Sequence, residues 1–195
     1  MSVSKDEFRR ALSSFASGVT VVTVCCADGQ LRGITVSAFS SLSLDPPLIL
    51  ICIDKKSSIY DHLRLNTPFA VNILAETQQD VSRLFASKGP DRFADLEHST
   101  GATGAPLIKG SLAVIECAVV NIFPGGDHSI FVGEVKSTDG DPNGSPLTYF
   151  RGGLFDAHPI GRPAPFPSSG QPVREGLVNF DPSARPSPHL ERYVH

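Results

Sequence analysis

The sequence predicts a mainly β protein, an antiparallel barrel of about six strands, closed or nearly closed, with flanking helices. Three observations support this fold class. Short apolar or alternating segments recur along the first three quarters of the chain, the connections between them are short, and few stretches have helical periodicity. Short connections favour antiparallel pairing, and closure of the sheet removes unpaired edges.

The expected strands cover residues 19–26, 34–43, 48–53 and 69–74, a long hairpin of residues 111–123 and 128–136, and a closing strand at 147–150. Turns are expected at Asp28-Gly29 and at residues 124–127. Pro46 and Pro47 separate two strands, because proline cannot donate to a ladder and forces an extended entry. Residues 48–53 are apolar on both faces, which predicts a central strand covered on both sides.

Helices are expected at three places. Ser4 and Glu7 have the spacing of a capping box and precede an apolar stripe, so a helix should open the chain, cover another surface with that stripe and end at Gly18. Residues 77–80 can cap a second helix that runs to Phe85. A third, short helix is expected at residues 59–65.

Composition excludes several classes of function. The net charge is −3 and no long basic run is present, which argues against nucleic acid and anionic membranes as partners. Hydrophobic residues make up 41% of the chain, but no apolar run reaches the roughly 20 residues of a membrane span. The four cysteines form no CxxC pair, so reduced thiols in a cytoplasmic protein are expected, and no metal site.

The last part of the chain differs in composition. Eight of the 16 prolines follow Phe155. This density excludes a regular helix or sheet. We therefore expect one domain over residues 1–155 and a proline-rich tail over 156–195 that is either mobile or an extended arm on a partner subunit.

Hydroxyl side chains occupy one face of the expected strand 34–43. With a period of two, that face carries Thr35, Ser37, Phe39, Ser41 and Ser43, opposite a mostly apolar face. A row of hydroxyls at fixed spacing can bind a phosphate or the polar edge of a heterocycle. A solvated outer face of a half-exposed strand would give the same alternation.

A cationic loop follows the next strand. Lys55, Lys56, Ser57 and Ser58 come directly after the buried segment 48–53, where a rigid scaffold would hold them. They are candidate phosphate partners. Ser57 or Ser58 can equally be the N-cap of the short helix, and the two roles are compatible.

Five segments occur in an order that resembles one family: FASGVTVVT (15–23), GITVSAFSSLSLDPPL (33–48), FAVNIL (69–74), GDHSIFVGE (126–134) and LTYFRGG (147–153). They resemble the flavin reductase family with the FMN-binding split-barrel fold, a Greek-key barrel found in the reductase components of two-component flavin-dependent monooxygenases. The resemblance covers roughly residues 8–155. It implies a homodimer that binds FMN or FAD near the subunit interface, with NADH or NADPH as reductant.

The resemblance assigns flavin contacts by position. The isoalloxazine or ribityl region would be contacted by Thr35, Val36 and Ser37, on a strand supported by Ser41 and Ser43. The phosphate end would be surrounded by Asp54, Lys55 and Ser57. The backbone of Ala70, Val71 and Asn72 would line the ring, and the loop carrying Arg92 and Phe93 would approach the flavin.

Three further residues receive roles from the same resemblance. His128 would lie beside the nicotinamide; outside this context, a histidine after a turn is a solvated surface residue. Arg151 would meet a phosphate and Tyr149 would border the ring. Ordinary barrel packing is the alternative role for Tyr149.

The favoured function is that of an NAD(P)H:flavin oxidoreductase that supplies reduced flavin to a monooxygenase. The chain has no obvious nucleophile with its base and no GxGxxG fingerprint after a strand; hydride transfer to a flavin needs neither, because the cofactor carries that chemistry. Two alternatives stay open: a flavin carrier without a nicotinamide pocket, and a split-barrel oxidase with its own substrate, as in relatives of pyridoxine phosphate oxidase.

Overall fold

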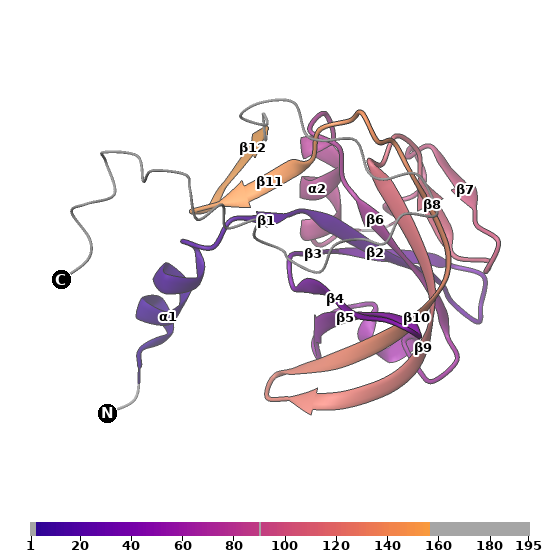
Figure 1. Cartoon of the computed structure of the whole chain (residues 1–195), viewed down its shortest axis with the longest axis horizontal. Coiled ribbons are helices and arrows are strands. Elements are labelled where there is room, and N and C mark those ends of the chain that lie inside the picture. The colour runs from indigo at the N-terminus through magenta and orange to yellow at the C-terminus, as the bar shows by residue number, and fades with distance from the viewer. Residues whose placement is uncertain (1–2, 90, 157–195) are drawn as a thin grey trace, which may run out of the picture. The chain divides into compact units, whose positions relative to one another are not determined.

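A seven-stranded antiparallel sheet forms the centre of the computed structural model, which describes residues 3–89 and 91–156 (Figure 1). Its strands, in spatial order, are β3 (Leu31–Val36), β2 (Thr20–Cys25), β6 (Pro68–Ile73), β9 (Ala113–Gly125), β10 (His128–Gly140), β5 (Pro47–Asp54) and β4 (Phe39–Leu44). The mainly β, antiparallel fold is therefore confirmed.

Two smaller sheets accompany the large one. One consists of β1 (Ser17–Gly18), β11 (Leu147–Phe150) and β12 (Gly153–Asp156), and the other of β7 (His98–Thr100) and β8 (Pro106–Ile108). The expectation of about six strands is wrong, because the described residues form twelve. The expected closing strand at 147–150 is β11, which pairs with β1 and β12 and not with the seven-stranded sheet.

The expected single strand 34–43 is in fact two strands, β3 and β4, separated by a bend at Ser37 and Ala38. The Phe39 N–H donates to the Ser37 carbonyl at 3.0 Å, and the Cys52 N–H donates to the Ala38 carbonyl at 3.0 Å. β3 pairs with β2 at one edge of the large sheet, and β4 pairs with β5 at the other edge. The chain itself thus connects the two edges of the barrel.

The bend also changes which side chains share a face. Val36 and Phe39 both pack into the same apolar core, although they are three residues apart. Thr35, by contrast, donates its hydroxyl proton to the Ser82 carbonyl of the neighbouring helix at 2.7 Å. The predicted continuous hydroxyl face is therefore wrong, since strand alternation does not continue through Ser37 and Ala38.

Two apolar cores lie on the two sides of β2. The barrel interior contains Val22 and Val24 together with the buried isoleucines of β5 and Phe69, Val71, Cys117, Val119 and Phe131. The second core contains Val19 and Val21 with Leu74, Phe85, Phe93, Ile108 and Leu147. β2 is consequently buried on both faces. β5 is not fully covered as expected: Ile49, Ile51 and Ile53 are buried, whereas its other face is half-buried.

Buried polar side chains attach the β7–β8 region to the outer face of the large sheet. Thr23 donates to the Pro106 carbonyl at 2.6 Å, and the Asn72 amide oxygen accepts from the Ile108 N–H at 2.8 Å. Glu116, 4% exposed, accepts from the Thr103 N–H at 2.7 Å, the Thr103 hydroxyl at 2.6 Å and the Ala102 N–H at 3.2 Å. Polar groups buried at these positions are thus satisfied.

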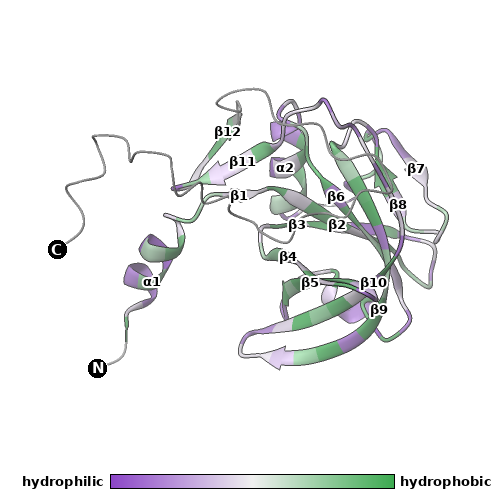
Figure 2. Cartoon of the chain, viewed as in Figure 1, coloured by the Kyte–Doolittle hydropathy of each residue, from purple (hydrophilic) through white to green (hydrophobic). Residues whose placement is uncertain are grey.

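The first helix, α1 (Lys5–Leu12), has the predicted capping box, because Ser4 and Glu7 bond reciprocally. It ends at Leu12 and not at Gly18. Ser13 interrupts it by donating its hydroxyl to the Arg10 carbonyl at 2.8 Å, a local bond that competes with helix continuation. α1 combines hydrophilic and hydrophobic residues (Figure 2), and its apolar stripe of Phe8 and Leu12, continued by Phe15, is exposed within the described chain.

The other two expected helices differ from prediction at their starts. α2 (Gln79–Ala86) follows Gln78, and no side chain caps it, so the capping role expected at residues 77–80 is wrong. In place of a helix at 59–65 there is a single 3₁₀ turn, η1 (Tyr60–His62), with Ile59 before it; neither Ser57 nor Ser58 caps it. Leu63 is extended, so the turn does not continue as a helix, and the Arg64 guanidinium donates to the carbonyls of Tyr60 and Leu63.

Other sequence expectations are confirmed. β9 and β10 form the long hairpin, with Gly126 at a φ of 72° in its turn. Cys25 is exposed and Cys26 buried, and no cysteine of the described chain forms a disulfide. None of the helices in residues 3–89 and 91–156 is long and apolar enough to cross a bilayer. The expectations for the proline-rich tail lie outside the described residues.

Replacement of Glu116 by Gln is expected to lower the free energy of unfolding by about 1–3 kcal/mol at pH 7, because a buried hydrogen-bonded carboxylate is lost. Burial acts to raise the pKa of Glu116, but its bonds from Thr103 and Ala102 outweigh this and hold the pKa below 4.5. The stabilising contribution is present above pH 4.5 and disappears as the pH falls through the folded-state pKa.

Urea denaturation of the wild type and of Glu116→Gln from pH 7 down to pH 3 tests this, and the difference between them should shrink below pH 4.5. Asp95→Asn, which changes an exposed carboxylate, is the control and should have little effect. A difference in the free energy of unfolding between the wild type and Glu116→Gln that stays constant across this pH range would contradict the lowered pKa of Glu116.

Candidate functional site

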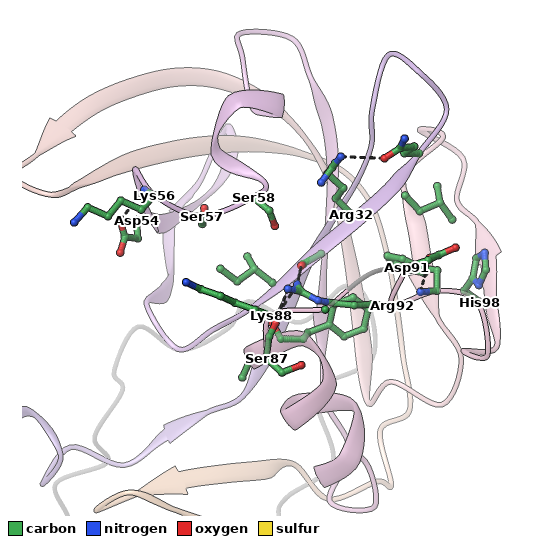
Figure 3. A pocket seen from close by; sticks show the side chains of 18 of the residues that line it. Arg32, Asp54, Lys56, Ser57, Ser58, Ser87, Lys88, Asp91, Arg92 and His98 are labelled. Carbon is green, nitrogen blue, oxygen red and sulfur yellow. Dashed lines mark hydrogen bonds between the residues drawn. The ribbon is translucent and has the colours of Figure 1, made fainter.

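A cavity of about 1210 Å³ opens between the β2–β3 turn, the loop after β5 and the loop after α2 (Figure 3). Four cationic side chains and two carboxylates line it: Arg32, Lys56, Lys88, Arg92, Asp54 and Asp91. None of the four cations forms an ion pair within the described residues. An excess of uncompensated positive charge in a chain of net charge −3 indicates a site for an anion.

Three donors at this cavity are buried without a partner. They are the Ser57 hydroxyl, Arg32 Nε and Arg92 Nε, which come from three different segments of the chain. Buried polar groups are almost always hydrogen-bonded, so three orphaned donors around one cavity favour a polar ligand there. Phosphate oxygens suit arginine N–H groups and a serine hydroxyl.

Arg92 is held in place by backbone carbonyls. Its guanidinium donates to the carbonyl of Gly33 at 2.7 Å and also to those of Phe85 and Ser87. These contacts orient Arg92 without neutralising its charge, because carbonyls carry no net charge. Gly33 is needed here, since a Cβ at this position would lie 2.6 Å from the Phe85 ring. Phe93, directly after Arg92, is buried in the second core.

Arg32 is oriented by a side chain two residues away. Its terminal nitrogen donates to Gln30 Oε1 at 2.9 Å. Burial raises the pKa of the Cys26 thiol, while the nearby Arg32 acts in the opposite direction. The thiol therefore stays neutral near pH 7 and leaves the positive charge of Arg32 uncompensated.

The hairpin tip lies beside the loop after β5. His128 is paired with Asp54 in the β10–β5 register, and Lys55 Nζ donates to the Gly126 carbonyl at 2.6 Å. His128 Nδ1 lies 2.8 Å from Asp127 Oδ1, and the bond and charge of His128 lower the pKa of Asp127. The side chain of His128 is 42% exposed. The structure thus brings His128 next to residues that border the cavity.

Six of the residues predicted from the sequence line the cavity: Asp54, Lys56, Ser57, Ser58, Arg92 and Phe93. Lys55 is directed to the hairpin turn, and Lys56 takes the cavity position. The remaining residues of the bent segment lie elsewhere: Val36 is in the barrel core, Ser37 and Ser41 are exposed, and Ser43 is half-buried.

Two other groups of predicted residues lie away from the cavity lining. Ala70, Val71 and Asn72 are fully buried in β6, with ladder partners on both β2 and β9. Tyr149 packs on the second core from β11, and Arg151 lies over the Phe150 ring at 5.1 Å with a φ of 47°.

Two of the four cations at the cavity were not predicted from the sequence. Arg32 directly precedes the GITVSAF motif, and Lys88 lies in the segment that ends α2. The sequence contains one signal for Arg32, its position at the start of the matched segment. Lys88 lies in the same loop as Arg92 and Phe93, which the family resemblance brings toward the flavin, but no motif singles it out.

Comparison with known proteins identifies the family. A model described as "Flavin reductase like domain" matches residues 12–158. A "Probable flavin reductase" of Rhizobium meliloti (strain 1021) is 40% identical over 171 residues, covering 87% of this chain and 54% of that protein. The reductase component of the flavin-dependent trigonelline monooxygenase of Acinetobacter baylyi is 43% identical over 149 residues, covering 76% of this chain and 48% of that protein.

The chain therefore spans about half the length of these two relatives. Among solved structures, the NADH:FAD oxidoreductase SgcE6 of Streptomyces globisporus, in complex with NAD and FAD fragments, superimposes with a TM-score of 0.76 at 37% identity. That match covers 81% of this chain and 95% of the other. On the evidence of the matched domain, these identities and the shared fold, the chain belongs to the flavin reductase family.

Proposed function

We propose that the protein is an NAD(P)H:flavin oxidoreductase that transfers a hydride from NADH or NADPH to FMN or FAD. The observation that carries the proposal is the register of β10 on β5, which sets His128 opposite Asp54 at the border of a cation-lined cavity. A residue suited to the nicotinamide and a site suited to flavin phosphate thus adjoin each other.

The residues at the cavity fit the phosphate end of a flavin nucleotide. The orphaned Ser57 hydroxyl supplies a donor and Lys56 supplies charge, and Arg92, with its orphaned Nε, belongs to the same cavity lining. The Asp54 carboxylate accepts a hydrogen bond from the Lys56 N–H at 2.8 Å, which stabilises the loop after β5. Lys55 does not line the cavity, and one of its three N–H donors binds the Gly126 carbonyl, so it can contribute charge to the phosphate end from the hairpin tip.

For the ring, we retain the positions assigned by the family resemblance. Thr35 has donated its hydroxyl proton to Ser82, so it can only accept from a ligand. The exposed Ser37 and Ser41 are free to do both, Val36 and Ser43 support them, and Ala70, Val71 and Asn72 form the strand behind. Tyr149 and Arg151 enter this site only if a second subunit contributes them.

A bound flavin would supply the hydride acceptor, and the protein's task is to position the reactants. We assign His128 a hydrogen bond to the nicotinamide. With Asp127 accepting from Nδ1–H, the ring is held so that the Nε2 atom of its neutral form is left as an acceptor. This orientation suits the amide N–H of a carboxamide.

Anaerobic stopped-flow mixing with NADH tests the proposed activity. Flavin absorbance should bleach at a rate within the enzymatic range of about 1–10³ s⁻¹, because the protein orients the reactants. A flavin carrier would give no acceleration over free flavin, and that result, obtained with NADPH as well, would reject the reductase assignment.

Replacement of His128 by Ala should raise the KM for NADH about threefold to tenfold, as expected for the loss of one hydrogen bond, while leaving flavin affinity nearly unchanged. Steady-state kinetics together with flavin titration measure the two quantities separately. His62→Ala, on η1, is the matched control. An unchanged KM would remove His128 from the site.

We also propose that the protein is a homodimer. Leu42 and Leu44 on β4 are 49% and 90% exposed, and the α1 stripe with Phe15 is uncovered as well. Apolar patches of this kind on a chain surface mark interaction sites, and a twofold pairing of two copies is the commonest way to cover them. Such pairing would complete a ring site that one chain leaves open.

Introducing a charge at Leu44 should weaken this assembly. Leu44→Glu is expected to raise the dimer dissociation constant about tenfold or more, because a carboxylate would be buried at the interface. Analytical ultracentrifugation over a range of concentrations measures it. Leu84→Glu, at a less exposed leucine of α2, serves as the control. A wild type that sediments as a monomer throughout would contradict the dimer.

As to partners, one relative is by name the reductase component of a flavin-dependent monooxygenase. We propose that this chain likewise supplies reduced flavin to a separate monooxygenase, and that it acts in the cytoplasm. Free thiols at all four cysteines support a reducing compartment.

A further inference from the structure

We infer that the cavity binds FAD, a flavin with two phosphates, in preference to FMN. Arg32, positioned by Gln30, binds the second phosphate. This inference rests on the proposed function and names its substrate more closely. It follows from the arrangement of the unpaired donors and from the extent of the cavity around them.

The cationic groups are spread along the cavity. Figure 3 shows Lys56 and Ser57 toward one end, Arg32 and Arg92 further along, and His98 beyond them. Because Arg92 donates to the carbonyl of Gly33, it is fixed next to the residue that follows Arg32. Arg32 lies on β3 and Arg92 is bonded to β3, so we call these two side chains the arginine pair; Lys56 and Ser57 lie instead in the loop after β5.

Each end of this row has a buried donor without a partner. The Ser57 hydroxyl can serve one phosphate, whereas Arg32 Nε and Arg92 Nε are left for another. FMN ends at its single phosphate and would leave the arginine pair uncompensated. In FAD a diphosphate continues toward an adenosine, which presents a second anionic group to this pair.

The cavity also has room for the adenosine. Its volume of about 1210 Å³ is at or above the upper end of the roughly 300–1,000 Å³ typical of small-molecule sites. Beyond the arginines, the His98 ring packs edge-on against Phe93 at a centroid distance of 5.2 Å, which holds an aromatic group at the cavity wall. An FMN phosphate alone would leave this part of the cavity to water.

The Gln30–Arg32 pair is suited to positioning. The bond from the Arg32 terminal nitrogen to Gln30 Oε1, 2.9 Å long, restricts the guanidinium while its Nε stays free. Gln30 thus acts through Arg32 and is a positioning residue. A lysine at position 32 would keep the charge but lose both the planar fork and the Nε donor.

Equilibrium titrations of FAD and FMN, followed by flavin fluorescence, test the inference without any measurement of activity. The wild type should bind FAD more tightly than FMN. Arg32→Leu should weaken FAD about tenfold or more, as for a charge-assisted hydrogen bond, and weaken FMN less than about threefold. Gln30→Leu should give a smaller loss in the same direction, and Arg32→Lys should lie between Arg32→Leu and the wild type.

The matched control is Arg83→Leu. Arg83 also contacts a glutamine, Gln79, but it is exposed on α2 and does not line the cavity, so neither flavin should be affected. Thermal unfolding of each variant shows whether it is folded. If Arg32→Leu does not fold, the FAD and FMN titrations of Gln30→Leu and Arg32→Lys test the inference in its place.

NAD⁺ also contains a diphosphate, so Arg32 could bind NAD⁺ in place of FAD. Titration of NAD⁺ against the FMN-loaded protein distinguishes these two possibilities. Weaker NAD⁺ binding by Arg32→Leu with FAD affinity unchanged would overturn the inference, as would equal losses for FAD and FMN. If the wild type binds neither flavin, the proposed function itself is wrong.

Discussion

The bend at Ser37 and Ala38 is the constraint on which the rest of the structure depends. It directs β3 to β2 and β4 to β5, the two edges of one sheet, so that the covalent chain connects the edges where no ladder does. Edges brought together in this way enclose the barrel core, with Val36 before the bend and Phe39 after it on the same side. The start of β3 is then left to face α2 and the cavity.

The cavity combines rigid walls with uncompensated charge. Arg92 is fixed by carbonyls of β3 and α2, Arg32 by Gln30, and Ser57 by the short loop between β5 and η1. Cationic groups held apart from carboxylates keep an unfavourable self-energy that an anionic ligand relieves. Both the proposed flavin site and the inferred preference for FAD follow from this one electrostatic imbalance.

Much of the fold could be predicted from the sequence, because hydrophobic periodicity, the capping box and the turn glycines are local signals. The predictions were wrong where tertiary contacts determine the local structure. Alternation over residues 34–43 gives no sign of the bend, since hydrogen bonds from Phe39 and Cys52 create it. The helix expected at 59–65 is a single 3₁₀ turn, because the chain becomes extended at Leu63, where the Arg64 side chain bonds back to the turn.

The residues of the candidate site also divide into those that the sequence indicates and those that only the fold brings together. Ser57 could be predicted from the cationic loop after a buried strand and Arg92 from the family resemblance, and the cavity contains both. Arg32 and Lys88 could not, because their importance arises from the folding of two distant segments over one space. The hydroxyl row could be seen in the sequence, but its division between two strands is a property of the barrel. The strands that pair are far apart in the sequence, which has a consequence during synthesis. On the side that faces β10, Ile53 of β5 has no ladder partner until Ser129 has emerged from the ribosome. A nascent chain that stops short of β10 therefore exposes the apolar side of a two-stranded ribbon, which is prone to aggregate.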